Sequence, residues 1–174
     1  MTTPQKLTCP LSPVIDPSAP ANSQAGRTIL ITGGASGIGY EIAKSFLAAS
    51  AAKVIITGRR VEKLEEAVAS LNSSKPEKST ATVLWRQQDV SDLSSIETFW
   101  KDLKSDNLEV DVLVLNATHT GQFGVSAGWK KVWECFEFNV LGSLRMSEEF
   151  VAQGPKKGKV SRHPQLPYPV CENS

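Results

Sequence analysis

The chain has 174 residues, of which 40% are hydrophobic and 21% charged, the composition of one soluble globular domain with a buried core. Its formal net charge of +1 and isoelectric point near 7.7 supply no field that would favour nucleic acid or an anionic membrane as the main partner. No apolar run approaches the roughly 20 residues of a membrane helix, and prolines from Pro4 to Pro20 interrupt any signal-peptide core, so we expect a cytoplasmic protein.

Residues 1–26 form the first segment, which is rich in proline, serine, threonine and alanine. Such a composition buries too little surface to offset the entropy lost on ordering, so we expect a disordered tail. The spacing of Pro10 and Pro13 would suit a proline-binding module, but that spacing is common by chance.

A strand, a glycine-rich turn and a helix are predicted next. The apolar run 29–31 leads into Thr-Gly-Gly-Ala-Ser-Gly-Ile-Gly at residues 32–39, and apolar side chains then recur with helical spacing over 40–51. Glycines let a phosphate approach backbone N–H groups in a tight turn, and the positive end of the helix dipole favours an anion there. The turn therefore predicts a pyrophosphate site. Its candidate residues are Gly33, Ser36, Gly37, Ile38 and Gly39.

This turn also carries a resemblance to a known family. The spacing of Thr32-Gly33, Gly37 and Gly39 resembles the Thr-Gly-x-x-x-Gly-x-Gly cofactor fingerprint of the short-chain dehydrogenase/reductase family. The resemblance implies a doubly wound, Rossmann-like α/β fold with a parallel sheet. It also implies a nicotinamide dinucleotide cofactor and hydride transfer to or from a carbonyl or alcohol.

The second predicted strand, 53–57, is apolar on consecutive positions, as in a parallel sheet covered on both faces. It ends in Arg59 and Arg60. In a doubly wound fold this end lies by the adenosine ribose, where an acid suits the 2′-hydroxyl and an arginine suits a 2′-phosphate. The arginines therefore favour NADP(H) over NAD(H). The alternative is that both are solvated residues at the start of the next helix.

A helix over 61–71 and a third strand over 81–86 lead into Asp89 and Val90. In the family, an Asp-Val pair here lies along the adenine ring, and the resemblance implies that role for these two residues. The alternative is that Asp89 only helps to start the next helix, which Ser91 or Asp92 can cap. The predicted apolar stripe of that helix is Ile96, Phe99, Trp100 and Leu103.

The fourth predicted strand, 110–116, ends in Asn116-Ala117-Thr118, a partial match to the family's Asn-Asn-Ala-Gly. The resemblance implies that Asn116 borders the cofactor. Leu115 and Thr118 depart from the pattern, and the Cβ of Thr118 can crowd a backbone that needs an unusual torsion.

A long helix is predicted over 129–151. Its Asn139-Val140-Leu141-Gly142 matches the family's Asn-Val-x-Gly, which implies that Asn139 holds a water in the proton relay behind the catalytic lysine. A capping or solvated asparagine is the alternative. By analogy with the family, this helix also contributes to self-association. The predicted packing positions are Val132, Trp133, Phe136, Val140, Leu144 and Phe150.

The resemblance ends near Val160, which gives a predicted dinucleotide-binding domain over 27–160 and an irregular tail over 161–174. The tail has no apolar run, and its three prolines forbid a central parallel strand, so we expect a sheet that stops after its fourth strand. The family's catalytic Tyr-x-x-x-Lys has no match in this tail, because Tyr168 is followed four residues later by Glu172. Tyr40 precedes Lys44 at that spacing but lies in the predicted cofactor-binding helix. Ser161 is at best a displaced substitute for the family's serine.

Other chemistry is not indicated by the remaining reactive side chains. Cys9, Cys135 and Cys171 form no Cys-x-x-Cys pair, and with His119 and His163 as the only histidines we expect free thiols and no metal site. The predicted strand order 3-2-1-4 leaves the fourth strand as an apolar edge that a partner or a second copy would cover.

Three functions stay open. The first is an NADP(H)-dependent oxidoreductase for an unidentified small molecule that is not self-sufficient in catalysis. The second is an NADP(H)-binding pseudoenzyme, and the third is a scaffold that acts through the apolar edge.

Overall fold

One parallel sheet forms the centre of the computed structural model, which describes residues 15–76, 79–119 and 128–154. The strands lie in the order β3-β2-β1-β4, which confirms the predicted doubly wound α/β fold and places β4 at an edge of the described sheet. The strands are β1 (Thr28–Thr32), β2 (Lys53–Gly58), β3 (Thr82–Gln87) and β4 (Val112–Val114). The helices are α1 (Gly37–Ala48), α2 (Val61–Ser74), α3 (Leu93–Ser105), α4 (Trp129–Phe136) and α5 (Gly142–Ala152).

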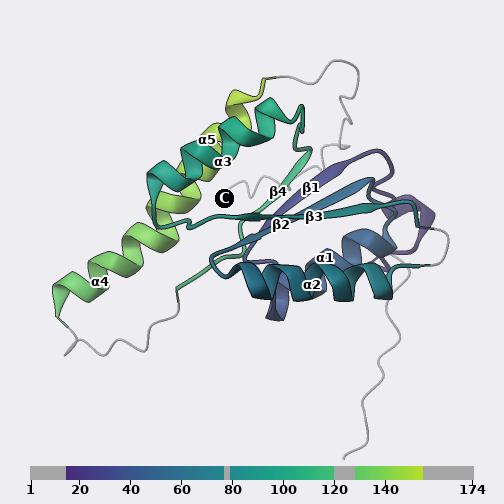
Figure 1. Ribbon diagram of the computed structural model, residues 1–174, viewed down its shortest axis with the longest axis horizontal. Helices are drawn as coiled ribbons and strands as arrows, with labels where there is room; N and C mark the ends of the chain where they lie inside the picture. The colour runs from purple at the N-terminus through teal and green to yellow at the C-terminus, as the bar shows by residue number, and fades with distance from the viewer. Residues whose placement is uncertain (1–14, 77–78, 120–127, 155–174) are drawn as a thin grey trace, which may run out of the picture.

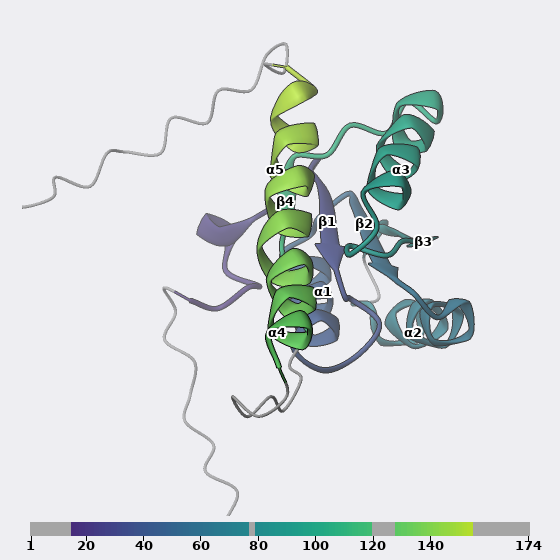
Figure 2. The ribbon, with the colours of Figure 1, turned by 90° about the vertical axis from the view of Figure 1, so that its left-hand side faces the viewer.

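Helices cover both faces of this sheet (Figure 1). Ile29 and Ile31 of β1 belong to a core with α1 and α2, whereas Leu30 belongs to a second core with α3 and α5. Successive residues of a strand point to opposite faces, so a strand covered on both sides needs an uninterrupted apolar run. Figure 2 shows the same two layers from the side.

Helix α3 follows the sequence prediction closely. Its four predicted stripe residues, 96, 99, 100 and 103, are all buried in the second core. Of the two candidate caps, Asp92 is the N-cap, because its Oδ1 accepts the backbone N–H of Ser94 at 2.9 Å and the Ser94 hydroxyl at 2.8 Å.

The predicted helix over 129–151 is present, but its buried face was predicted wrongly. A π-helical segment, η3 (Glu137–Leu141), joins α4 to α5. The buried or packed residues are Phe138, Gly142, Met146 and Phe150, spaced four apart. Five of the six predicted packing positions, Val132, Trp133, Phe136, Val140 and Leu144, are instead 46–54% exposed. The helix carries two apolar stripes, and the sheet and α3 cover only one of them.

Residues 15–26 differ from the predicted disorder. They contain a short 3₁₀ helix, η1 (Pro20–Asn22), which has a proline in its first turn. Asp16 accepts bonds from the backbone N–H and hydroxyl of Ser18, and the Gln24 N–H donates to the Ala49 carbonyl at 2.7 Å. Polar side chains that satisfy local backbone groups therefore order this segment against the end of α1.

Several predictions concern residues outside the described ranges. They include Pro10 and Cys9 near the N-terminus, and Ser161, His163, Tyr168, Cys171 and Glu172 in the predicted irregular tail. Within the described ranges, no helix is both long enough and apolar enough to span a membrane.

Candidate cofactor site

The turn between β1 and α1 is tied to the end of β4. The Thr32 hydroxyl accepts the backbone N–H groups of Asn116 and Ala117, both at 3.0 Å, and donates to the Val114 carbonyl at 3.3 Å. The Asn116 side-chain amide donates to the carbonyls of Thr32 at 3.0 Å and Gly33 at 3.3 Å. Asn116 thus lies beside the turn, and its amide fixes the turn; that it borders the cofactor stays a prediction.

Glycine is required at two positions of the turn for different reasons. Gly37 has φ +56°, and a Cβ added there would meet nothing within 4 Å, so it faces open space. Gly39 is buried, and an added Cβ would collide with the Gly33 carbonyl and the Asn116 amide. Gly39 is therefore needed for close packing of the helix on the turn, whereas Gly37 leaves room for a ligand.

Ser36, Gly37 and Ile38 lie exposed at the N-terminus of α1. The Ile38 side chain is 76% exposed, and Ser36, the N-cap residue, makes no side-chain capping bond. The first N–H groups of a helix need an external acceptor, and the helix dipole favours an anionic one. The residues present therefore fit the pyrophosphate of a dinucleotide.

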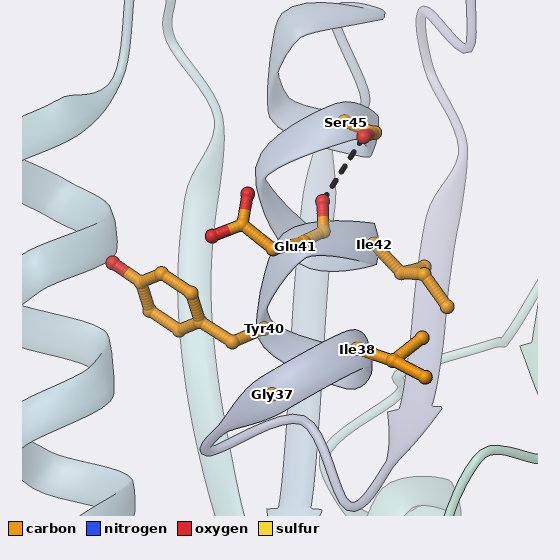
Figure 3. Close-up of a pocket in the computed structure, with 6 residues that line it drawn as sticks. All are labelled: Gly37, Ile38, Tyr40, Glu41, Ile42 and Ser45. Atoms are coloured by element: carbon orange, nitrogen blue, oxygen red, sulfur yellow. Dashed lines mark hydrogen bonds between the residues drawn. The ribbon is translucent and has the colours of Figure 1, made fainter. Parts of the chain in front are cut away.

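An open groove of about 540 Å³ continues from this helix N-terminus along α1. Figure 3 shows Ile38 and Ile42 on one side of the helix and Tyr40 and Glu41 on the other. The groove is completed by Gly37 and Ser45. It places an apolar surface next to the candidate phosphate site.

Arg59 lies at the carboxyl end of β2 with an exposed side chain. Its carbonyl accepts the Gln87 side-chain amide at 3.0 Å, and its guanidinium lies over the Phe138 ring, with Cζ 6.0 Å from the ring centroid. It forms no ion pair with any carboxylate of the described ranges. The neighbouring Arg60 is the N-cap residue of α2 and is also exposed.

Asp89 and Val90 follow β3 and lie at the same end of the sheet. Oδ1 of Asp89 accepts the N–H of Ser91 at 3.0 Å and its hydroxyl at 2.7 Å, so one carboxylate oxygen serves the local turn. The Val90 side chain is buried. A Cβ added at Gly142 would collide with the Val90 carbonyl, so the start of α5 packs against this turn backbone to backbone.

Asn139 in η3 is exposed and caps no helix, but its side chain bonds to the segment after β4. Its Oδ1 accepts the Thr118 hydroxyl and the His119 N–H, both at 2.9 Å, and its Nδ2 donates to the His119 carbonyl at 3.2 Å. The side chain thus holds the segment that follows β4. The expected crowding at Thr118 does not arise, because Thr118 has no positive φ. The proton-relay role of Asn139 stays a prediction.

Sequence reasoning missed Gln88, a buried residue at the centre of this region. Its Oε1 accepts the Thr57 hydroxyl at 2.9 Å, and its Nε2 donates to the Met146 sulfur at 2.9 Å. The amide therefore joins the end of β2 to α5. No local pattern signals such a role, because glutamine is usually exposed.

Comparison with known proteins gives a family and several relatives. The model of the short chain dehydrogenase family matches residues 27–160. The NADP-dependent 3-hydroxy acid dehydrogenase of Schizosaccharomyces pombe is 35% identical over 130 residues, which is 70% of this chain and 46% of the relative. The short-chain dehydrogenase/reductase ffsI of Aspergillus flavipes is 38% identical over 101 residues, 58% of this chain and 29% of the relative.

Solved structures show the same fold. L-sorbose reductase from Gluconobacter frateurii, complexed with NADPH and L-sorbose, matches with a TM-score of 0.65 and 27% identity over 75% of this chain and 48% of that chain. An alcohol dehydrogenase from Thermococcus sibiricus, complexed with 5-hydroxy-NADP, matches with a TM-score of 0.63 and 28% identity over 72% of this chain and 52% of that chain. The chain spans about half the length of these structures and less than half of the two curated relatives.

Proposed function

Because this chain belongs to the short-chain dehydrogenase family, which matches it over residues 27–160, we propose that it binds NADP(H) at the turn between β1 and α1. The bound dinucleotide would supply or accept the hydride in an oxidation or reduction of a small alcohol or carbonyl compound. The observation that carries the proposal is the open space at Gly37, next to an uncapped helix N-terminus.

Each part of the turn has a role in this proposal. The N–H groups at Ser36, Gly37 and Ile38 bind the pyrophosphate, and the missing side chain of Gly37 allows the close approach. Thr32 and Asn116 hold the turn in shape through their bonds between β1 and β4. Asp89 and Val90 border the adenine, with the second Asp89 oxygen as the acceptor for its amine.

The choice of NADP(H) over NAD(H) rests on Arg59. Its guanidinium is exposed at the end of β2 and free of ion pairs with described carboxylates, so it is available to a 2′-phosphate. Two relatives support the proposal: the Schizosaccharomyces pombe enzyme is NADP-dependent, and the sorbose reductase structure contains NADPH.

A second candidate function follows from the sequence. The family moves the proton during hydride transfer with a Tyr-x-x-x-Lys pair. The one match in the 174 residues, Tyr40 and Lys44, lies in α1, where the Tyr40 hydroxyl bonds to the Ser70 hydroxyl. We therefore propose that the 174 residues bind the cofactor without transferring hydride by themselves. Under this candidate, residues 27–160 serve as an NADP(H)-binding pseudoenzyme or interaction module.

Titration of the full chain with NADPH and NADH tests the proposal. We expect saturable binding with a preference for NADPH, and about a tenfold or greater loss of NADPH affinity in Arg59→Ala with little change for NADH, because charge-assisted bonds to the 2′-phosphate are lost. Arg86→Ala is the control, since Arg86 pairs with Asp106 on the surface.

Absence of saturable binding would reject the cofactor site. An unchanged preference for NADPH in Arg59→Ala would reject the role of Arg59 at the 2′-phosphate. Turnover of any substrate in an alcohol and carbonyl panel would reject the pseudoenzyme.

A further inference from the structure

Phe138 is the one buried residue of η3, and the roles assigned so far do not explain it. Its ring is 8% exposed, while Val140 and Leu141 in the same segment are 46% and 40% exposed. A buried ring in this segment lies at the carboxyl end of the sheet, because the adjacent Asn139 bonds to the residues that follow β4.

Two side chains from different strand ends contact the Phe138 ring. The Arg59 guanidinium lies over the ring, with 6.0 Å from Cζ to the centroid. The His119 ring packs against it with 5.8 Å between centroids and 42° between the planes. Since β1 separates β2 from β4 in the sheet, the ring bridges the strand ends on either side of the glycine turn.

Two attachments fix the backbone that directly follows Phe138. Asn139 bonds to Thr118 and His119 after β4, and Gly142 packs against the Val90 carbonyl after β3. The ring belongs to the same π-helical turn as Asn139, directly before the first attachment. Short π-helical segments within α-helices often occur at functional sites.

We propose that Phe138 is a positioning residue that holds the Arg59 guanidinium at the 2′-phosphate site and thereby strengthens the preference for NADP(H). This inference rests on the proposed function. An exposed arginine has many rotamers, and fixing one of them on binding costs entropy. A ring beneath the guanidinium restricts the side chain before the phosphate arrives. A guanidinium that stacks on a ring through its face keeps its N–H edge free for the phosphate.

Binding of adenosine 2′,5′-bisphosphate and adenosine 5′-monophosphate to the full chain tests the inference, because only the first ligand has the 2′-phosphate. We expect Phe138→Leu to lower the ratio of the two affinities about three- to fivefold, as loss of an exposed cation–π contact would, while binding of the monophosphate changes little. Phe138→Tyr keeps the ring face and should keep the ratio. Phe136→Leu is the matched control, because its half-exposed ring stacks on Trp133 and not on Arg59.

An Arg59→Ala background separates positioning from packing. If Phe138 acts through Arg59, Phe138→Leu should leave the affinity ratio of Arg59→Ala unchanged. An equal loss of affinity for both ligands would overturn the inference and show a packing role. Phe138→Met replaces Phe138→Leu if circular dichroism shows that the leucine variant is unfolded.

The same titrations distinguish failure of the inference from failure of the proposed function. If the unmodified chain binds neither ligand, the proposed cofactor site falls, and the inference falls with it. If the unmodified chain selects the bisphosphate through Arg59 and Phe138→Leu keeps that selection, only the inference is wrong.

Discussion

Thr32 makes more bonds in the cofactor turn than any other side chain described there. Its hydroxyl accepts two backbone N–H groups from the segment after β4 and donates to a β4 carbonyl. One residue therefore sets the distance between the turn and the neighbouring strand. A side chain of the same shape without the hydroxyl would leave two amide groups without their acceptor.

We expect Thr32→Val to lower the free energy of unfolding by about 1–3 kcal/mol, because removing the acceptor leaves donors unsatisfied. Urea denaturation followed by circular dichroism measures this change. Thr28→Val is the control, since Thr28 is also buried in β1, and its bond to Asp111 is made by the backbone N–H. Equal losses in the two variants would show that the Thr32 hydroxyl has no special role.

Two glycines of the same turn should separate binding from folding. Gly37→Ala places a methyl group in open space at φ +56°, so we expect a stability loss of about 1–2 kcal/mol and at least a tenfold loss of NADPH affinity. Gly34→Ala brings a Cβ to 2.6 Å from the Ile56 side chain, so we expect the larger effect on stability, with the folded fraction still binding. Thermal denaturation and NADPH titration measure the two effects, and retained affinity in Gly37→Ala would contradict the phosphate site.

At the scale of elements, the cap of α3 makes stability depend on pH. Hydrogen bonds from the Ser94 hydroxyl and N–H hold the pKa of Asp92 below its ordinary value. A lowered pKa in the folded state means that the charged cap contributes stability above about pH 4, the unfolded pKa, and that this contribution is lost as the pH falls through the folded pKa.

The comparison of Asp92→Asn with the unmodified chain tests this dependence. Asparagine also caps a helix but carries no charge, so we expect it to lower the melting temperature at pH 7, with a deficit that shrinks progressively as the pH falls below about 4. Ser94→Ala should reduce the difference, because it removes one of the bonds that lower the pKa of Asp92. A deficit that stays constant from pH 7 to pH 3 would contradict the assigned cause.

The elements differ in how well sequence patterns predict them. The strands and α3 were predicted correctly because each has one clear apolar pattern. In β1 and β2 the apolar residues are consecutive, and in α3 four apolar residues recur with helical spacing. The helix after β4 has apolar side chains on two stripes, and its sequence does not say which one the sheet will cover. The wrong choice there follows from tertiary packing that no local pattern contains.

The candidate site divides in the same way. The glycine turn and Arg59 carry local signals, since the first needs particular backbone angles and the second a particular charge at a strand end. The contributions of Gln88 and Phe138 come from contacts between β2, β3 and the last helix pair, far apart in the sequence. Such contacts become visible only when the fold is known.

For the whole molecule, the outer surface of the last helix pair, α4 and α5, is an apolar surface that no other described element covers. Figure 1 shows α4 projecting beyond the sheet. Exposed apolar side chains run along α4, η3 and α5, and each is 40–74% exposed. These residues are Trp129, Val132, Trp133, Phe136, Val140, Leu141, Leu144 and Val151. We expect an apolar surface of this extent to be an interaction site.

The charges at the ends of this surface favour a second copy of the chain as its partner. Lys130 and Lys131 are exposed at the start of α4, so this end of the surface is basic. Glu148 and Glu149 lie in α5, and both form ion pairs with the same residue, Arg145, so the other end is acidic. In a two-fold symmetric, antiparallel pair the basic end of one copy lies beside the acidic end of the other. Each contact then occurs twice.

We therefore expect the full chain to dimerise through this surface, with a dissociation constant that rises with salt concentration because the end contacts are ionic. Trp133→Glu should raise the dissociation constant at least tenfold, while Lys104→Glu, an exposed change on α3, should have little effect. Sedimentation velocity over a range of concentrations measures both dissociation constants.

Reversing the charges at Lys130 and Lys131 should weaken the dimer. Reversing Glu148 and Glu149 as well should restore it, because opposite charges again face each other. A monomer at every concentration would contradict self-association, and a dimer unaffected by Trp133→Glu would move the interface to another surface, with the unpaired edge of β4 as the next to test.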